Sequence, residues 1–395
     1  MRILYLVHRF PYPPDKGDKI RSFHWLQALT RHHEVHLVTL MDDPADAVHM
    51  PEVELRCASV VVVPVRKLAS RVRAFGAVFF GGSLSVALFQ ERRAHAAARQ
   101  ILRDHDIDLI FEFSAATAKF LVAGTGIPRV LDMVDVDSQK FFGYAELSSS
   151  AKRMLLELEA KRLRSFEREC VQDHDATLLC TDQEADLLRD FADVGRIAHV
   201  KNGAALPPDP SDCGARPHLV FVGAMGYQAN VDAVVWGAEE IMPLVLRTHP
   251  DARFLIVGRN PTREVKALAS LPGIEVHENA PDVGVFLEGA AAALIPLRVA
   301  QGIQNKVLEA MAFRLPVITN PRVAAALHAT PGVDILVAAS PSEYACHVTA
   351  MLDSREASQA IGDAGRALVE RDFAWESSYD ALEAILQNVL RSAQS

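Results

Sequence analysis

Short apolar runs alternate with longer amphipathic stretches along most of the chain. Before residue 181, six runs rich in β-branched residues occur at 3–7, 35–40, 59–63, 108–113, 129–133 and 176–180. Helix-length patterns lie between them, for example at 90–104, 115–123 and 150–173. Continuous apolar runs separated by helices are typical of parallel strands that helices cover on both faces. The first part of the chain is therefore predicted to form an α/β domain.

The same alternation restarts after a proline-rich segment, 205–217, which is interpreted as a linker. Strands are expected at 219–223, 252–258, 274–278, 292–297, 316–319 and 334–338, and helices at 231–247, 262–270 and 304–313. This pattern predicts two doubly wound, Rossmann-like α/β domains, 1–204 and 218–375, that face each other across a central cleft. Ligands of such sheets bind at the carboxyl ends of the strands, so the cleft is the expected site.

Composition and charge narrow the class of protein. The chain has 395 residues, of which 50% are hydrophobic and 23% charged, so it can bury a large core. Its net charge of −9 argues against a general nucleic-acid binder. Five scattered cysteines without a C-x-x-C motif exclude a zinc ribbon and argue against a secreted disulfide scaffold. The apolar run at the N-terminus is too short for a signal peptide and is interrupted by Arg9, so a cytoplasmic protein is expected.

The charge is unevenly distributed. Residues 51–100 contain eight Lys or Arg and three Asp or Glu, while 74–90 carry no charge and are rich in Phe. This uncharged stretch is shorter than the roughly 20 apolar residues that a membrane span needs. Two interpretations stay open: an ordinary helix packed on its own domain, or a cationic and apolar patch that binds peripherally to an anionic bilayer.

The loop after the first strand carries a candidate anion site. Neither G-x-G-x-x-G nor G-x-x-x-x-G-K-[ST] occurs, which excludes the usual dinucleotide and P-loop fingerprints. Gly17 stands at a predicted helix start together with Lys16, Lys19 and Arg21. A helix N-terminus with nearby cations favours an anion such as a phosphate, and the alternative is a solvent-exposed basic turn. The histidines of RHHEVH (31–36) do not have metal-site spacing, so no metal is expected.

Residues 296–319 are the most informative segment, because they combine a strand end, a glycine turn, a helix and a second strand. Gly302 permits a ligand to approach the backbone, and a helix beginning near Gln304 offers N–H groups beside Lys306. Glu309 follows about one turn later on nearly the same face. A nucleotide-sugar, with its diphosphate at the helix start and its hydroxyls at the carboxylate, fits this pattern. The alternative is a surface ion pair between Lys306 and Glu309.

This segment resembles the signature of family 4 glycosyltransferases, in which two glutamates with seven residues between them are followed by A-M-A and a Pro-containing strand. Residues 309–312 (EAMA) and 315–317 (LPV) match its second half. Supporting matches occur at 200–203, 221–223, 255–258 and 373–376, so the resemblance covers nearly the whole chain. The segments 17–23, 132–140, 223–236 and 298–312 are similar to the sugar transferases of exosortase-associated exopolysaccharide systems. The resemblance implies a GT-B fold, in which helix 376–395 returns to the first domain.

The resemblance also implies an activity: a retaining hexosyltransferase that moves a sugar from a nucleoside-diphosphate sugar to a glycan or lipid-linked acceptor. Such a reaction needs no metal, because cations and helix dipoles stabilise the leaving diphosphate. Glu309 would bind the ribose, Lys306 the diphosphate, and Gln301 the donor sugar, with Asp135 as a fourth catalytic candidate. The residues expected to bind the donor are Gly17, Gly223, Arg259, Arg298, Gly302, Ile303, Gln304 and Asn305.

Three departures from the family pattern keep other functions open. Gln301 replaces the first glutamate and cannot carry charge; loop 224–230 has no cation, which leaves Lys306, Arg298 and Arg259 for the phosphates. Asp135 replaces a histidine of the family, and it lies with Asp132 and Asp137 in a stretch that could bind sugar hydroxyls or cap the next helix. A degenerate transferase that acts as a binding or scaffold partner, or a nucleotide-sugar 2-epimerase, are the alternatives. The sequence does not specify the base, the sugar, the acceptor or the oligomeric state.

Overall fold

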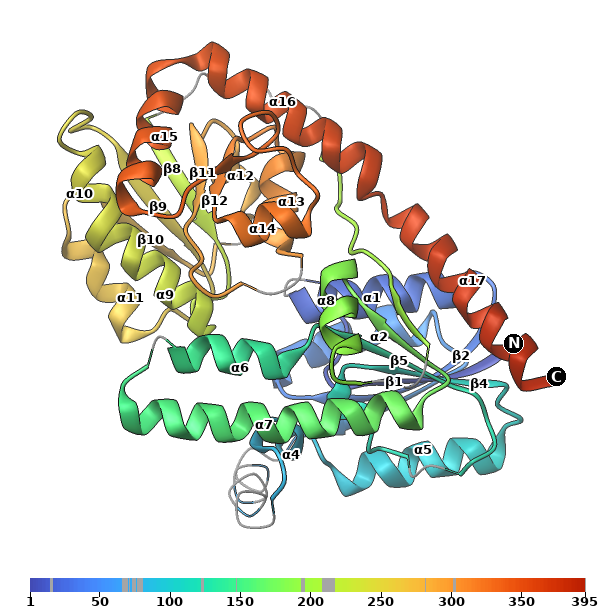
Figure 1. Ribbon diagram of the computed structural model, residues 1–395. Coiled ribbons are helices and arrows are strands. Elements are labelled where there is room, and N and C mark those ends of the chain that lie inside the picture. The colour runs from blue at the N-terminus through green and yellow to red at the C-terminus, as the bar shows by residue number, and fades with distance from the viewer. Residues whose placement is uncertain are drawn as a thin grey trace. The chain divides into compact units, whose positions relative to one another are not determined.

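A computed structural model describes residues 1–14, 17–65, 70, 72, 76, 81–121, 124–146, 148–192, 196–207, 217–280, 282–300 and 303–394. The chain divides into two compact units (Figure 1). The first unit comprises residues 1–201 and 376–395, and the second comprises residues 202–375. The described parts of the predicted linker, 205–207 and 217, belong to the second unit, and 208–216 lie outside the described residues.

The first unit is built on a seven-stranded parallel sheet with the order β3-β2-β1-β4-β5-β6-β7. Tyr5 of an interior strand is paired with Leu37 on one side and Phe111 on the other. The middle strands are buried along nearly their whole length, which explains their continuous apolar runs, whereas β3 at the edge is only partly buried. The strands are β1 (Arg2–Val7), β2 (Glu34–Met41), β3 (Ser59–Pro64), β4 (Leu109–Phe113), β5 (Arg129–Val134), β6 (Ala176–Leu179) and β7 (Ile197–His199).

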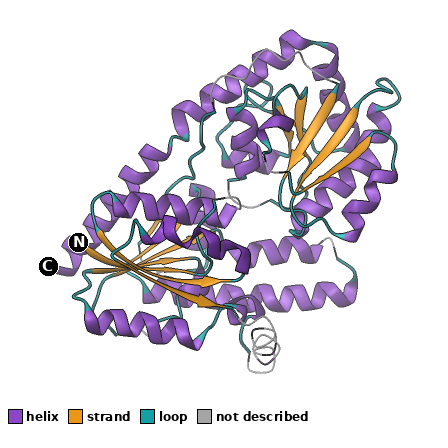
Figure 2. Ribbon diagram, turned by 180° about the vertical axis from the view of Figure 1, so that it is seen from behind, coloured by secondary structure: helices purple, strands orange, loops and turns teal. Residues whose placement is uncertain are grey.

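Helices cover both faces of this sheet (Figure 2). They are α1 (Gly17–Thr30), α2 (Met50–Glu54), α4 (Leu84–Leu88), α5 (Arg92–Asp104), α6 (Asp137–Glu146), α7 (Ser150–Asp173), α8 (Asp182–Arg189) and α17 (Trp375–Gln394), with 3₁₀ turns at Pro44–His49 and Ala115–Thr117. Ala98 and Ile101 of α5 pack on Leu4, Leu6 and Ile110 of the sheet in one apolar cluster. Within the described residues, no helix combines the length and apolarity needed to cross a bilayer.

The C-terminal helix α17 packs on the first unit. Tyr379 Oη lies 2.5 Å from His24 Nδ1, and the ring of Tyr379 stacks under the guanidinium of Arg31. Further along the helix, Glu383 Oε2 lies 2.7 Å from His33 Nε2. Segments more than 300 residues apart in the sequence therefore share one core.

The second unit contains a six-stranded parallel sheet with the order β10-β9-β8-β11-β12-β13. Its strands are β8 (His218–Val222), β9 (Arg253–Gly258), β10 (Ile274–Glu278), β11 (Ala292–Ile295), β12 (Val317–Thr319) and β13 (Leu336–Val337). Its helices are α9 (Gln228–Trp236), which continues through a π turn (Gly237–Ile241) into α10 (Met242–Val245), α11 (Arg263–Ala267), α12 (Gly284–Leu287), α13 (Asn305–Ala312), α14 (Pro321–Ala326), α15 (Pro341–Asp353) and α16 (Arg355–Asp372), and a 3₁₀ turn lies at Leu268–Ser270.

The predicted fold class, two doubly wound parallel-sheet domains, is confirmed. One predicted helix, 115–123, is wrong: only Ala115–Thr117 forms a 3₁₀ turn, and 122–123 lie outside the described residues. The Thr117 hydroxyl donates to the Phe113 carbonyl, a local bond that competes with continued helix. The short edge strand β7 was not predicted, because its three residues, two half-buried and one exposed, form no apolar run.

Candidate functional site

The candidate site of the second unit lies where its strand order reverses. Strand β8 is hydrogen-bonded to β9 on one side and to β11 on the other, and the two following helices, α9 and α13, start from the carboxyl ends of β8 and β11. In an open parallel sheet this switch point is the usual place for a ligand, since the loops diverge there. Gly223 follows β8, and the predicted residues 303–306 and Glu309 follow β11, so they lie at this point.

Helix α13 begins at Asn305, after Gln304 in an extended conformation (φ −92°, ψ 102°) that makes no side-chain cap. The first N–H groups of a helix have no intrahelical acceptor, so they favour an anion. Ile303 is buried just before the helix, and Asn305 Oδ1 accepts a hydrogen bond from Asn202 Nδ2 at 3.0 Å. These contacts fix the start of α13 against its own unit.

Lys306, in the first turn of α13, has no carboxylate partner among the described residues. Its Nζ donates to Asn230 Oδ1 at 2.5 Å and lies 5.0 Å from the centre of the Phe221 ring. Burial lowers the pKa of Lys306 to about 7, because a neutral amide and an aromatic face replace water poorly around an ammonium group. An anion placed beside this amine would stabilise its charged form.

Glu309 lies one turn after Lys306 and makes no hydrogen bond or ion pair with its side chain to any residue that the structure describes. Burial raises the pKa of this carboxyl above its ordinary value. The alternative of a Lys306–Glu309 surface pair is therefore wrong. A partly buried carboxylate without donors is suited to accept hydrogen bonds from ligand hydroxyls.

Two glycines allow the 223–230 loop to lie against the end of β9. The N–H of Gly223 donates to the Val257 carbonyl at 3.0 Å, and a Cβ added to Gly258 would lie 1.7 Å from the Gly223 carbonyl oxygen. Asn230 is 3% exposed and donates from Nδ2 to the Ala224 carbonyl at 3.0 Å. The amide of Asn230 thus joins the loop to Lys306.

The two arginines predicted at this site have different surroundings. Arg298 forms a bidentate ion pair with Asp232, with Nε 2.9 Å from Oδ2, and its guanidinium lies 5.7 Å from the centre of the Trp236 ring. Its charge is therefore balanced within the protein. Arg259 is exposed, and its carbonyl accepts a hydrogen bond from Met225 N. Gln301 and Gly302 lie outside the described residues.

In the first unit, Gly17 is the first residue of α1, but the cations expected beside it are placed differently. Lys19 and Arg21 are each 1% exposed, and Lys16 lies outside the described residues. Lys19 Nζ is 2.6 Å from Asp46 Oδ2, and Arg21 Nε is 2.7 Å from Asp132 Oδ2. Their proposed role as phosphate-binding cations is wrong, since both are neutralised in the core of the unit.

The carboxylates within and just after β5 also have different surroundings. Asp132 is fully buried and accepts hydrogen bonds from Arg21 and the Trp25 indole N–H. Asp135 is paired with Lys140 (2.9 Å) and accepts from the Cys180 thiol (2.8 Å). Asp135 therefore lies at the end of β5 with one side chain already balancing its charge.

The cap of helix α6 comes from a residue that the sequence did not indicate. Asp137 is the first residue of the helix and its carboxylate contacts Lys140 at 3.0 Å. Glu167 of α7 instead accepts from the Ser138 N–H (2.9 Å) and hydroxyl (2.5 Å). Burial raises the pKa of Glu167 to about 7. No local signal marks Glu167, because it lies 29 residues away in the chain.

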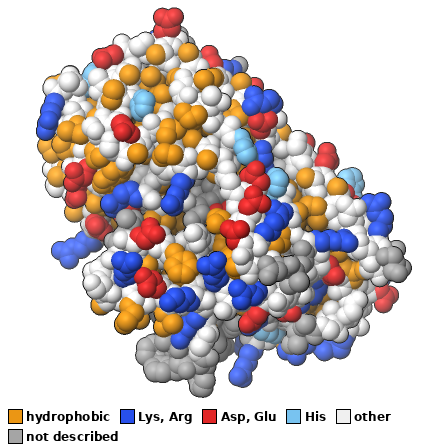
Figure 3. Space-filling view, in the orientation of Figure 1, with side chains coloured by type: hydrophobic (Ala, Val, Ile, Leu, Met, Phe, Trp, Pro, Cys, Tyr) orange, Lys and Arg blue, Asp and Glu red, His pale blue; other side chains and the backbone are white. Residues whose placement is uncertain are grey.

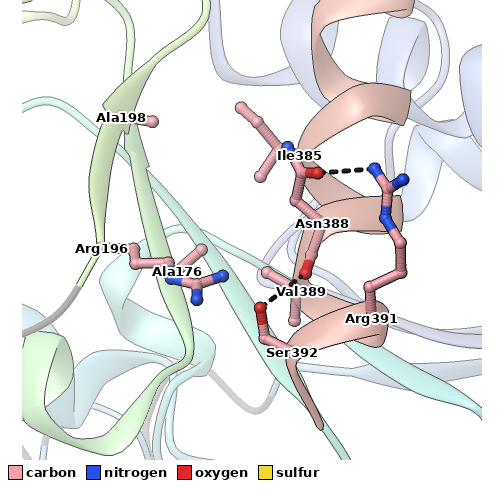
Figure 4. Close-up of a pocket in the computed structure, with 8 residues that line it drawn as sticks. All are labelled: Ala176, Arg196, Ala198, Ile385, Asn388, Val389, Arg391 and Ser392. Carbon is pink, nitrogen blue, oxygen red and sulfur yellow. Dashed lines mark hydrogen bonds between the residues drawn. The ribbon is translucent and has the colours of Figure 1, made fainter. Parts of the chain in front are cut away.

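A groove of about 540 Å³ lies elsewhere in the first unit, between the starts of β6 and β7 and the last turns of α17 (Figure 4). It is at the amino ends of these strands, opposite the edge that carries Asp135. It is lined by Ala176, Arg196, Ala198, Ile385, Asn388, Val389, Arg391 and Ser392. Among the described side chains, no group of three His, Cys, Asp or Glu residues is arranged to hold a metal ion.

With this geometry established, comparison with known proteins is informative. Residues 216–354 match the family model for glycosyl transferases group 1. This range contains β8, α9 and α13, and hence Lys306 and Glu309. No curated protein sequence matches the chain. The match and the fold together support a glycosyltransferase.

Solved structures share the fold over almost the full length. A sucrose-phosphate synthase from Thermosynechococcus elongatus is 15% identical with a TM-score of 0.72, covering 99% of this chain and 100% of that one. Anabaena HepE, solved with UDP and glucose, is 12% identical with a TM-score of 0.66, covering 98% and 99%. A UDP-forming α,α-trehalose-phosphate synthase from Burkholderia xenovorans is 10% identical with a TM-score of 0.65, covering 100% and 99%. The fold is GT-B.

Proposed function

We propose that this protein is a retaining hexosyltransferase that uses a nucleoside-diphosphate sugar as its donor. The observation that carries the proposal is the pair Lys306 and Glu309. Among the residues that the structure describes, a half-buried amine has no carboxylate counterion and a half-buried carboxylate has no hydrogen-bond donor, and the two lie one turn apart at the switch point of a parallel sheet. The glycosyl transferases group 1 match over this region, and the UDP and UDP-glucose bound to the HepE structures, support the same conclusion.

In this proposal each group has a separate role. Lys306 and the N-terminus of α13 neutralise the diphosphate, and Glu309 accepts hydrogen bonds from the ribose hydroxyls. During transfer, the bond from the anomeric carbon to the diphosphate oxygen breaks, and a bond from that carbon to an acceptor hydroxyl oxygen forms. The leaving oxygen gains negative charge, which Lys306 stabilises, and the hydroxyl proton passes to a phosphate oxygen or solvent. Protein cations do the neutralising, so the scheme requires no metal.

Other residues keep predicted roles within the same scheme. Gln301 and Gly302 would contact the donor sugar, Arg259 and Arg298 are additional phosphate candidates, and Asp135 is the candidate on the first unit. Asp132 is fully buried in its ion pair with Arg21, whereas Asp135, paired with Lys140, is partly exposed. Asp135 is therefore the better of the two for contacting a sugar hydroxyl.

The decisive experiment compares Glu309→Ala with Glu264→Ala, an exposed glutamate on α11. Nucleotide release is measured for a panel of nucleoside-diphosphate sugars, with and without a lipid extract as acceptor. Glu309→Ala should lose most of its activity while its circular dichroism and unfolding midpoint stay as in the wild type. Wild-type turnover by Glu309→Ala would refute the assignment, and an equal loss in Glu264→Ala would show that the effect is not specific.

A nucleotide-sugar-binding scaffold is the second candidate. Two observations favour it: the 224–230 loop carries no cation, and Arg298 is already paired with Asp232. Calorimetry with nucleoside diphosphates separates the two functions, because a scaffold would bind without any turnover in the donor screen. Release of free sugar and nucleotide without an acceptor would instead indicate a 2-epimerase.

The biological setting is also a proposal. The resemblance of 17–23, 132–140, 223–236 and 298–312 to exosortase-associated transferases supports a role in exopolysaccharide synthesis, with a lipid-linked acceptor at the cytoplasmic face of the membrane. Product analysis with purified polyprenyl-phosphate sugars as acceptors tests this setting. Transfer only to soluble sugars would contradict it.

A further inference from the structure

Three large apolar side chains are exposed on the first turns of α7. Met154 is 68% exposed, Leu155 63% and Leu158 41%. Leu158 follows Met154 by four residues and Leu155 by three, which places all three on one side of the helix. Such a cluster differs from the single exposed apolar residues that are ordinary on protein surfaces.

The short helix α4 extends this surface. Its start is held against α7, because the buried carboxylate of Glu159 accepts from the Ser83 hydroxyl at 2.6 Å and from the Leu84 N–H at 3.0 Å. Leu84 and Leu88 of α4 are 37% and 38% exposed. We name the surface formed by Met154, Leu155, Leu158, Leu84 and Leu88 the α7–α4 face.

Cations accompany these apolar side chains. Lys161 follows Met154 by seven residues and Leu158 by three, which places it on the same side of α7. Lys152 and Lys161 are exposed, and neither forms an ion pair with any residue that the structure describes. Residues 150–164 contain five Lys or Arg and two Asp or Glu, and one of those acids is the buried Glu159. Figure 3 shows basic, acidic and apolar side chains interspersed on the side of the molecule where α7 lies.

We infer that the α7–α4 face binds the surface of an anionic lipid bilayer. Apolar side chains would enter the boundary between headgroups and acyl chains, while lysines at its border contact lipid phosphates. This inference goes beyond glycosyl transfer and does not rest on it. The sequence-based expectation of a membrane patch concerned the Phe-rich stretch 74–90, of which 74–75 and 77–80 lie outside the described residues. The α7–α4 face shares Leu84 and Leu88 with that stretch and adds three side chains of α7.

A second copy of the chain fits this face less well than a bilayer. A twofold contact would bring the same surface together with itself, and would therefore oppose Lys152 and Lys161 to their own copies. Five half-exposed side chains also provide much less contact than the roughly 1,200–2,000 Å² that stable interfaces bury.

The test is flotation of the full chain with vesicles of phosphatidylcholine alone or with 30 mol% phosphatidylglycerol, as roughly fits an anionic leaflet. The variants are M154S/L158S and K152Q/K161Q, and the matched control is L55S, whose leucine is 84% exposed in the same unit. All substituted side chains are exposed, so the variants should fold, which circular dichroism checks. The wild type and L55S should bind the anionic vesicles, and M154S/L158S should bind at least about tenfold more weakly.

The charge variant gives an independent readout. K152Q/K161Q should lose binding to anionic vesicles by about tenfold, and the wild type should lose it as salt is raised, because each lysine contributes electrostatically. Absence of wild-type binding at low salt would overturn the inference, as would equal binding by M154S/L158S. A wild-type dimer in light scattering that M154S/L158S dissociates would also overturn it, and would assign the face to a second copy.

Discussion

Replacing Lys306 by methionine should leave the second unit folded while it removes binding of nucleoside diphosphates. Methionine keeps the length of the side chain and removes its charge. The folded protein holds the lysine ammonium against the Phe221 ring and the Asn230 amide, and no residue that the structure describes supplies a carboxylate to it. A lysine that served only stability would have a counterion or remain in water. We therefore interpret this arrangement, which lowers stability, as one that serves ligand binding.

The size of this cost follows from the pKa. Burial lowers the pKa of Lys306 from 10.5 to about 7, and one pKa unit corresponds to about 1.4 kcal/mol. Between pH 7 and 10.5 the unfolded chain binds more protons at this group than the folded protein does, so stability rises with pH in that window. The cost of burying the charged lysine is absent above pH 10.5, grows as the pH falls, and is full below pH 7. At pH 6 the charged lysine costs the folded state at most about 5 kcal/mol.

The assay is urea unfolding of wild type and Lys306→Met at pH 6 and pH 9, followed by tryptophan fluorescence. The variant leaves the Asn230 oxygen without its donor, a cost of about 1–3 kcal/mol that does not change with pH. The stability of the variant relative to wild type should therefore fall by about 2–3 kcal/mol from pH 6 to pH 9. In calorimetry the variant should bind UDP at least about a hundredfold more weakly, as expected for losing a buried charged contact. A relative stability that is the same at both pH values, or unchanged UDP binding, would refute the reasoning.

Three further predictions concern the framework of the site. Asp132→Asn should destabilise the first unit by about 3–5 kcal/mol in urea unfolding, because it leaves Arg21 charged in the core; a loss below about 1 kcal/mol would contradict the buried-pair argument. Burial raises the pKa of Glu167 to about 7, so the native protein binds the extra proton and its stability falls as pH rises from 4.5 to 7. As the pH rises across that window, the stability of Glu167→Gln relative to wild type should therefore increase, by about 1.4 kcal/mol per pH unit at most. A relative stability that increased as the pH fell would contradict this prediction. Gly258→Ala should give little soluble protein or a free energy of unfolding lowered by more than about 2 kcal/mol, since its Cβ would lie 1.7 Å from the Gly223 oxygen; a free energy of unfolding equal to that of the wild type would show that the loop can move.

The parallel sheets could be predicted from the sequence because their strands are buried on both faces and therefore read as continuous apolar runs. For example, strands 3–7 and 252–258 could be predicted from their apolar runs alone. Elements without such a run were missed or misassigned: β7 has two half-buried residues and one exposed, and 115–123 has the composition of a helix but forms one turn. For β7 the deciding contact is its pairing with β6, and for 115–123 it is the local bond from the Thr117 hydroxyl to the Phe113 carbonyl. Hydrophobic periodicity records neither.

The candidate site was predictable where its residues share one local segment. Lys306 and Glu309 are three residues apart, so the helical repeat alone placed them together. The counterions were not predictable, since Asp46 lies 27 residues from Lys19 and Asp132 lies 111 from Arg21. Counting basic residues around Gly17 therefore suggested a phosphate site, although these charges are neutralised at long range.

The return of α17 to the first unit has a consequence for the order of folding during synthesis. Ribosomes release chains from the N-terminus, and domains generally fold as units as they emerge. The second unit is continuous from 202 to 375, so it can fold as soon as it is released. The first unit must wait, because the partners of His24 and His33 are Tyr379 and Glu383. The part made first is completed last, and the apolar surface that α17 covers is exposed to chaperones throughout that interval.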